Sequence, residues 1–377
     1  MRFKYVEWNG EAFATQEHLE FFSNFLDFVI EYGDQALEAL RQMEMDPEQR
    51  ALLEKLIEEG LLEKVGARFK LTPRAIGSLQ RKALMEVFRN LRAGGGDGHE
   101  AHQTGILGER IEGTRPYQFG DPIGELDLTA TLRNALRRNG PGTPVRIHER
   151  DFEVGLTESK ATCSTVILLD MSGSMYRMGR FSNAKRCAMA VYALIRQRYP
   201  LDSVDVVGFF SGAEVIPEHK LPLTLPKRVT MFDSNVRLRV RLAKLAEAPQ
   251  HFTNLHLGLM TARRLLARRG GVNKQVFIIT DGEPTAHLQG EYVYLLYPPD
   301  RATTVATLSE AMLMARQGIR FATFALIDDY FGMDWVGFVD QLTKLTRGVG
   351  FYCTGDSLAA CIMESYLSGK RRKAYLA

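Results

Sequence analysis

The chain of 377 residues exceeds one usual domain of about 150, so its length predicts two domains. Hydrophobic residues make up 45% and charged residues 25% of the sequence, which excludes disordered, collagen-like and disulfide-scaffold proteins. The net charge of +3 is near neutral for this length and gives no reason to invoke nucleic acid or acidic lipid.

The charge is unevenly distributed. Residues 1–63 hold 5 basic and 15 acidic side chains, a net charge of −10, whereas residues 64–90 hold 7 basic and 1 acidic, a net charge of +6. The remainder therefore carries +7. Such asymmetry indicates interaction surfaces, with solvated faces as the alternative.

No window approaches the roughly 18 apolar residues of a membrane-spanning helix, and the first residues lack the apolar stretch of a signal peptide. The cysteines form no Cys-x-x-Cys pair, which argues against a disulfide framework and a thiolate zinc site. They are Cys163, Cys187, Cys353 and Cys361. We therefore predict a cytoplasmic protein with free thiols and no membrane span.

Residues 1–92 are predicted to form an acidic helical domain. Apolar residues at helical spacing between Glu17 and Leu40 predict one or two amphipathic helices. A helix ending at Gly60, a two-stranded element over 62–71 and a helix opened by Pro73 then follow in the order of a winged-helix unit.

A winged helix suggests nucleic-acid binding, in which basic wing residues contact phosphates. Those residues are Lys64, Arg68 and Lys70. The helix before the hairpin argues against this function, because Glu54, Glu58 and Glu59 would face a polyanion. We favour a protein-docking or structural role for this domain.

Residues 93–127 are rich in glycine and are predicted to be a linker. His99 and His102 have a spacing suited to metal ligands, but a flexible loop offers no support, so we expect solvated histidines. Residues 128–160 are predicted to form a basic helix followed by an exposed strand over 145–154.

From residue 161 onward, strand patterns alternate with helix patterns, which predicts an α/β fold with a doubly wound, mainly parallel, Rossmann-like sheet covered on both faces. The predicted domain spans residues 161–369, and a basic tail spans 370–377. The expected strands cover 163–170, 205–211, 275–281, 319–326 and a short segment near Phe351, and the expected helices cover 181–198, 255–268, 304–317, 334–345 and a segment from Asp356.

Polar residues follow the apolar strand patterns. Asp170, Ser172 and Ser174 end the first strand, Asp281 ends the strand at 275, and Thr253 lies in the loop before the helix at 255. Ligands of open α/β sheets bind beyond the carboxyl ends of the strands, so we expect these side chains to converge. Carboxylate and hydroxyl oxygens suit a hard cation such as Mg²⁺.

These five residues resemble the metal-ion-dependent adhesion site (MIDAS) of von Willebrand factor A (vWA) domains, whose motif is Asp-x-Ser-x-Ser, then Thr, then Asp. All five positions match in order, separated by gaps of 83 and 28 residues that allow strand-and-helix crossovers. The resemblance implies bound Mg²⁺, with Mn²⁺ or Ca²⁺ as alternatives, and an open coordination position that takes an Asp or Glu of a partner protein. It also implies that Ser172 and Ser174 bind the metal directly, Asp170 and Asp281 directly or through water, and Thr253 according to the ligand state.

The alternative for the hydroxyl residues is local: Ser172 and Ser174 could cap the following helix, and Thr253 with Asn254 could cap the helix at 255. Gly173 would let the loop approach the ion closely.

Residues 126–142, the stretch YLLYPPDRATTVATLSEAM and the closing YLSGKRRK resemble bacterial, cytoplasmic CoxE-like vWA proteins, which work with MoxR-type AAA+ ATPases. The resemblance covers roughly residues 115–377. The chain lacks a Gly-x-x-x-x-Gly-Lys-Ser/Thr loop, since the nearest candidate, at 270–275, has neither the spacing nor the hydroxyl. We therefore predict a non-enzymatic adaptor that couples an ATPase to a client for complex remodelling or metal-centre maturation.

A metal-assisted hydrolase is the alternative from the enzyme class, with His251 or Glu283 as general base. Glu283 could also compete internally for the metal. Basic residues are candidates for docking an acidic protein surface, and residues 1–63 of the same chain are one candidate for that surface; solvation is the alternative. They are Arg133, Arg137, Arg138, Lys370, Arg371, Arg372 and Lys373.

Overall fold

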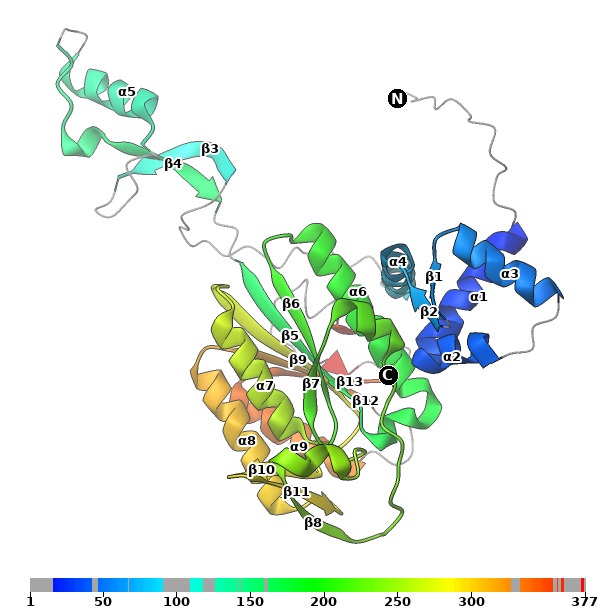
Figure 1. Ribbon diagram of the computed structural model, residues 1–377. Helices are drawn as coiled ribbons and strands as arrows, with labels where there is room; N and C mark the ends of the chain where they lie inside the picture. The colour runs from blue at the N-terminus through cyan, green and yellow to red at the C-terminus, as the bar shows by residue number, and fades with distance from the viewer. Residues whose placement is uncertain are drawn as a thin grey trace.

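A seven-stranded sheet forms the centre of the protein in the computed structural model, with strand order β14-β13-β12-β9-β5-β6-β7 (Figure 1). All neighbouring strands run parallel except β7, which pairs antiparallel with β6. The strands are β5 (Cys163–Asp170), β6 (Ser203–Phe209), β7 (Ala213–Ile216), β9 (Asn273–Thr280), β12 (Arg320–Leu326), β13 (Val349–Cys353) and β14 (Ala374–Tyr375). The structure describes residues 16–42, 47–66, 68–90, 109–117, 126–140, 142, 144–158, 162–326, 333–354, 358, 361–362 and 374–375.

Helices cover both faces of this sheet. One face carries α6 (Arg180–Arg198), and the other carries α7 (Leu255–Arg268), α8 (Arg301–Arg316) and α9 (Met333–Thr346). Every residue of β5 is buried, because its alternate side chains enter two different apolar cores. The predicted α/β fold with a mainly parallel sheet is therefore confirmed, and we call the part from residue 162 onward the α/β domain.

The described residues before position 91 form an N-terminal unit. It consists of α1 (Gln16–Tyr32), α2 (Asp34–Gln42), α3 (Pro47–Glu58), β1 (Leu62–Val65), β2 (Arg68–Leu71) and α4 (Pro73–Asn90). Gly60, with a left-handed φ of 67°, ends the α3 segment, while Thr72 accepts a hydrogen bond from Ala75 N–H at the start of α4. The predicted order of helix, hairpin and helix is present; the winged-helix resemblance stays a prediction.

The N-terminal unit packs on α6. Val29 of α1 and Leu79 of α4 belong to the same buried apolar core as Ala188 of α6. Asp27 forms ion pairs with Lys82 of its own unit (2.6 Å) and with Arg186 of α6 (3.2 Å). The acidic front of the chain thus contacts the α/β domain, both on α6 and, through Gly33, at Leu223.

A separate segment contains β3 (Glu109–Pro116), α5 (Leu128–Asn139) and β4 (Glu153–Glu158), with β3 antiparallel to β4. Strand β3 lies inside the stretch 93–127 that was predicted to be a linker. His99, His102 and the tail residues 370–373 lie outside the described residues.

The strand predicted over 145–154 is wrong for most of its length, because Glu149–Asp151 form a 3-10 turn and β4 begins only at Glu153. The Asp151 carboxylate accepts hydrogen bonds from His148 N–H (2.7 Å) and from Arg138 of α5 (2.7 and 3.0 Å). These bonds hold the turn and override the alternating pattern. Arg138, a predicted docking residue, is therefore engaged within this segment.

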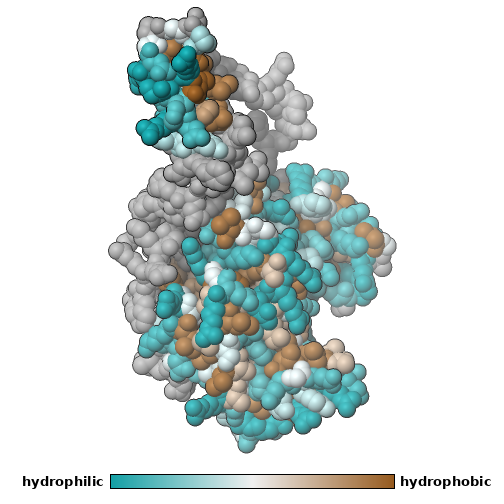
Figure 2. All heavy atoms as spheres, turned by 90° about the vertical axis from the view of Figure 1, so that its left-hand side faces the viewer, coloured by the Kyte–Doolittle hydropathy of each residue, from teal (hydrophilic) through white to brown (hydrophobic). Residues whose placement is uncertain are grey.

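Helix α5 exposes an apolar stripe spaced by four residues: Leu128, Leu132 and Leu136 are 66%, 41% and 40% exposed. Figure 2 shows brown, apolar side chains gathered on one side of this segment. The predicted stop of the helix is confirmed at Gly140, whose N–H donates to Leu136 O.

A small antiparallel sheet of β8 (Val236–Arg241), β10 (Ala286–Gln289) and β11 (Tyr292–Tyr297) lies beside the carboxyl ends of the central strands (Figure 1). The sequence pattern did not predict these strands. The four cysteines are buried thiols that form no disulfide bond, as expected. None of the helices in the described part of the chain has the length and apolar character needed to span a bilayer.

Candidate metal centre

Three loops meet where β5 and β9 end. Because the two strands are parallel neighbours in register at Leu169 and Ile279, the residues that follow them lie side by side. Gly173 N–H donates to His251 O (3.0 Å), which ties the loop after β5 to the loop before α7. The topology therefore brings these loops together at the carboxyl ends of the strands, as the sequence predicted.

Hydrogen bonds link four of the five predicted ligands. Ser172 N–H donates to Asp170 Oδ1 (2.8 Å), and the Ser172 and Ser174 hydroxyls lie 3.1 Å apart. Ser174 Oγ donates to Asp281 Oδ1 (2.7 Å), although the two residues are 107 positions apart in the sequence. Asp170, Ser172, Ser174 and Asp281 thus form one connected cluster of oxygen atoms.

Thr253 is anchored through its backbone. Its N–H donates to Thr285 Oγ1 (2.8 Å), and its carbonyl accepts hydrogen bonds from the N–H groups of Thr285 (2.9 Å) and Ala286 (3.1 Å). These contacts fix the loop that carries Thr253 to the segment that follows Asp281. The fifth predicted ligand, 6% exposed, is therefore anchored between the loop before α7 and the segment that follows Asp281.

The capping alternative fails at Ser172 and succeeds at Asn254. Ser172 occupies the position before the 3-10 segment η3 (Gly173–Gly179), but its side chain makes no capping hydrogen bond. Asn254 Oδ1 accepts from Leu257 N–H (3.0 Å) and caps α7. The cap of α7 therefore does not require the Thr253 hydroxyl.

The two carboxylates are buried. Asp170 has no exposed surface, and neither does the side chain of Asp281. Burial and, to a smaller extent, the charge of Asp281 together raise the pKa of Asp170 to about 7, while hydrogen bonds from Thr280 and Ser172 oppose the shift. Two buried like charges are costly unless a cation accompanies them.

Arg180 supplies one such cation, which the sequence reasoning missed. Its Nη1 donates to Asp281 Oδ2 at 2.6 Å. Met178 and Gly179, with φ of 51° and 67°, turn the chain so that α6 begins at Arg180. A basic residue in the first turn of a helix is unfavourable because it opposes the helix dipole. This unusual position was the sequence signal that could have pointed to a special role for Arg180.

Thr280 was also missed. Its hydroxyl donates to Asp170 Oδ2 (2.6 Å), so Asp170 accepts from Ser172 on one oxygen and from Thr280 on the other. The signal was a hydroxyl residue at the end of the otherwise apolar run Val276–Ile279.

The donor set fits a hard divalent cation. In the part of the chain that the structure describes, no three His, Cys, Asp or Glu side chains gather as metal ligands, so a cation here would depend on hydroxyl oxygens beside the two carboxylates. With both carboxylates ionised and Arg180 counted, the cluster carries a net charge of −1, which favours a cation but makes Arg180 its competitor for Asp281.

Glycine at position 173 is required by packing. A Cβ there would lie 2.5 Å from Val229 Cγ2 and 3.1 Å from the Cβ of His251. Gly173 thus allows close approach of two neighbouring loops, and its predicted close approach to the ion stays a prediction.

The two candidate general bases, His251 and Glu283, are half-buried. The ring of His251 stacks on Phe252 at a centroid distance of 4.6 Å, and its Nδ1 lies 3.4 Å from Thr230 N. Burial lowers the pKa of His251, which favours the neutral imidazole. Glu283 is half-buried, two residues beyond Asp281.

Residues 163–367 match the family described as "Rv0959-like protein, vWA domain", and residues 109–157 match the third domain of the same family. Protein Rv0959 of Mycobacterium tuberculosis and protein Mb0984 of Mycobacterium bovis are each 30% identical to this chain over 349 residues. The alignments cover 90% of this chain and 47% of each relative, so the chain spans about half the length of the curated relatives it matches.

Three solved structures have a related fold. The PilB minor pilin of Streptococcus sanguinis has 14% identity and a TM-score of 0.41, covering 60% of this chain and 66% of that one. The vWA domain of SpRpn10 has 12% identity and a TM-score of 0.34, covering 58% and 100%. Proximal thread matrix protein 1 of the mussel byssus, with a zinc-occupied MIDAS motif, has 14% identity and a TM-score of 0.35, covering 55% and 47%.

Proposed function

The chain belongs to the family of Rv0959-like proteins with a vWA domain, and from this premise we propose that it is a metal-dependent protein-binding module. vWA domains commonly mediate metal-dependent protein–protein interaction. The observation that carries the proposal is the hydrogen-bonded cluster of Asp170, Ser172, Ser174 and Asp281, which buries two carboxylates at the carboxyl edge of the sheet.

In this proposal the five MIDAS-like residues hold the cation. The hydroxyls of Ser172 and Ser174 are direct ligands, Asp170 and Asp281 bind directly or through water, and Thr253 joins according to the ligand state. Mg²⁺ is the first candidate, with Mn²⁺ and Ca²⁺ as alternatives, because all three take oxygen ligands. When bound, the cation supplies an open position for an Asp or Glu of a partner protein.

We further propose a cytoplasmic, non-enzymatic adaptor that works with a MoxR-type AAA+ ATPase in complex remodelling or metal-centre maturation. The support is the resemblance of residues 126–142 and of the closing YLSGKRRK to CoxE-like proteins, together with the lack of a phosphate-binding loop in the sequence. Binding is favoured over hydrolysis because the ring of His251 is stacked on Phe252 and directs Nδ1 to Thr230.

The experiment is a pull-down of a co-expressed MoxR-type ATPase from the same genome, in Mg²⁺ and in EDTA. We expect capture in Mg²⁺ only, and loss of capture for Asp170→Ala. The matched control is Asp233→Ala, which removes an exposed carboxylate. Equal Mg²⁺-dependent capture by Asp170→Ala would refute the metal bridge, and hydrolysis of phosphoesters or peptides that Asp170→Ala abolishes would favour the hydrolase.

A further inference from the structure

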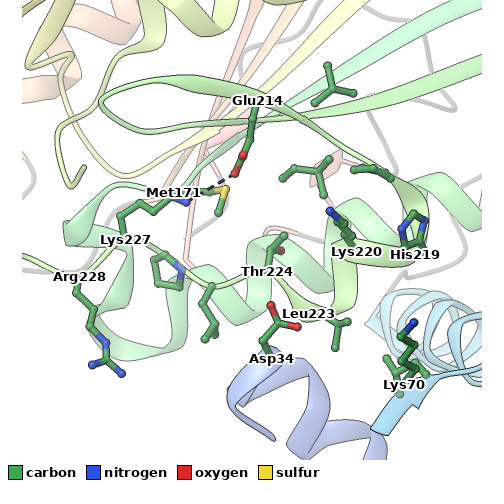
Figure 3. A pocket seen from close by; sticks show the side chains of 16 residues that line it. Asp34, Lys70, Met171, Glu214, His219, Lys220, Leu223, Thr224, Lys227 and Arg228 are labelled. Atoms are coloured by element: carbon green, nitrogen blue, oxygen red, sulfur yellow. Dashed lines mark ion pairs between the residues drawn. The ribbon is translucent and has the colours of Figure 1, made fainter. Parts of the chain in front are cut away.

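A pocket of about 880 Å³ lies where the N-terminal unit meets the α/β domain (Figure 3). Asp34 of α2 and Lys70 of β2 line it from the N-terminal unit, and the segment 214–228 lines it from the α/β domain. Met171, which stands between two predicted metal ligands, also lines it. The pocket therefore adjoins the candidate metal centre.

The pocket and the metal centre share a wall. Lys227 N–H donates to Met171 O (2.8 Å), and Val229 packs against the loop at Gly173. The side chains of Lys227 and Arg228 line the pocket from the same short stretch of chain. A molecule bound at the metal centre therefore has this pocket as its immediate neighbour.

Both units hold the segment of the pocket wall around Leu223 in place. Lys185 of α6 is fully buried, and its Nζ donates to Pro222 O and Thr224 O, each at 2.9 Å. Gly33, at a left-handed φ of 51°, lies against Leu223, where a Cβ would come within 2.5 Å of the Leu223 carbonyl oxygen. These contacts fix the segment 222–224 between α6 and the turn before α2.

Positive charge lines the pocket at both ends. Lys227 and Arg228 lie at one end, and Lys70 and Lys220 lie at the other (Figure 3). Lys227 is paired with Glu214 (3.7 Å) and lies over the ring of Phe210 (4.2 Å). Among the residues that the structure describes, Lys70, Lys220 and Arg228 have no carboxylate within ion-pair distance.

We propose that this pocket binds an acidic polypeptide segment of the partner that presents a carboxylate to the metal centre. The inference rests on the proposed function and names the chemistry of its partner. Cations at two separated ends suit an extended anionic chain better than one small anion, and the volume exceeds what a single carboxylate fills. Leu71, Ile216 and Leu225 add apolar wall for the side chains of a peptide.

A polynucleotide fits less well. Its uniform negative charge would meet Asp34 and Glu214 inside the pocket and the acidic helices α1 to α3 beside it. A polypeptide can place its acids opposite the lysines and its neutral side chains opposite the two carboxylates.

The test is fluorescence anisotropy with the full chain and a short fluorescein-labelled peptide of alternating Glu and Leu, in EDTA. We expect salt-sensitive binding that Lys70→Glu/Lys220→Glu weakens about tenfold, and Lys70→Gln/Lys220→Gln by less. Lys344→Glu, on α9 at the opposite face of the sheet, is the matched control and should bind like the wild type. Lys70 and Lys220 are exposed, so these variants should fold, which circular dichroism checks.

Calorimetry with Mg²⁺ on the same proteins separates the two proposals. The pocket proposal is overturned if the double Glu variant binds the peptide like the wild type, or if a short single-stranded oligonucleotide displaces the peptide at lower concentration than unlabelled peptide does. If either of these results is found and the protein still binds Mg²⁺, the pocket proposal fails but the metal proposal stands. Peptide binding without any Mg²⁺ binding refutes the metal proposal while the acidic-peptide pocket stands.

Discussion

The candidate metal centre and the contact between the N-terminal unit and α6 both bury charged groups, but they balance them differently. At the metal centre, Asp170 and Asp281 are buried as like charges, and Arg180 compensates only one of them. The deficit of one positive charge makes an external cation a natural ligand of that site.

At the contact with α6, opposite charges come from the two sides. Asp27 accepts ion pairs from Lys82 and Arg186, and the buried Lys185 has Asp34 as a nearby negative charge. Lys185 also places its ammonium on two backbone carbonyls. The ion pairs of Asp27 find both partners within the protein, so charge favours an external cation in the first region, whereas in the second it links the two units.

Removing one acid from the metal centre is the strongest test of this contrast. Asp170→Asn should lower Mg²⁺ affinity about 100-fold, or about 2.7 kcal/mol, because a charged ligand is lost. The free energy of unfolding in EDTA should stay within about 1 kcal/mol of the wild type, because a costly buried charge is removed with it. Calorimetry and urea denaturation measure the two quantities.

Asp233→Asn, which changes an exposed carboxylate on a neighbouring loop, should leave both quantities unchanged. Equal Mg²⁺ affinity of Asp170→Asn and wild type would mean that the buried acids serve the fold alone.

The same contrast separates what the sequence could and could not reveal. The run Cys163–Asp170 is apolar on both faces, and only a strand between two helical layers satisfies that pattern, so the fold followed from it. The meeting of Asp170 and the two serines with Asp281 was predictable because these residues follow the ends of two neighbouring parallel strands. Arg180 was not, since two left-handed residues decide where its guanidinium goes.

At two other places, tertiary contacts override what the local sequence pattern predicts. The alternation over 145–154 mimics a strand, but Arg138, from a different element, holds Asp151 in a turn. Lys185 occupies a helix position that reads as solvated, and only the carbonyls of Pro222 and Thr224 explain its burial. The partners of Asp151 and Lys185 come from other elements of the chain, so local propensity and periodicity cannot predict these contacts.

Replacing the buried Lys185 tests the contact between the N-terminal unit and α6. Burial lowers the pKa of Lys185 to about 7, with Arg186 contributing and Asp34 opposing. Below pH 7 the folded and unfolded chains both hold the proton; above it the folded chain releases a proton that the unfolded chain keeps. The free energy of unfolding therefore rises by about 2 kcal/mol between pH 7 and 9, and Lys185→Met should lack this rise.

Urea denaturation at several pH values measures this difference, since every other titrating group is common to both proteins. Lys344→Met, at an exposed lysine of α9, should keep the wild-type rise. Parallel stability curves for Lys185→Met and wild type would show that Lys185 stays protonated in the folded protein.

Removing the positive charge of Arg180 should strengthen metal binding at the candidate metal centre. Arg180→Gln should raise Mg²⁺ affinity about tenfold, or about 1.4 kcal/mol, because Asp281 Oδ2 loses its competing partner and the net charge becomes more negative. Arg177→Gln, at an exposed arginine of the same loop, is the control for a change in overall charge. Weaker Mg²⁺ binding by Arg180→Gln would instead make Arg180 a support that positions Asp281 for the metal.

The smallest effect is expected at Asp27, whose side chain is 38% exposed and therefore partly screened by water. Asp27→Asn should lower the free energy of unfolding by about 1 kcal/mol and speed hydrogen exchange in α1 more than in β5. Glu38→Gln, which removes an exposed pair with Arg41 within α2, should have less effect because that pair joins no two units. If both variants behaved alike, the cohesion of the two units would lie in the apolar contacts of Val29 and Leu79 with α6, and the ion pairs of Asp27 would only orient them.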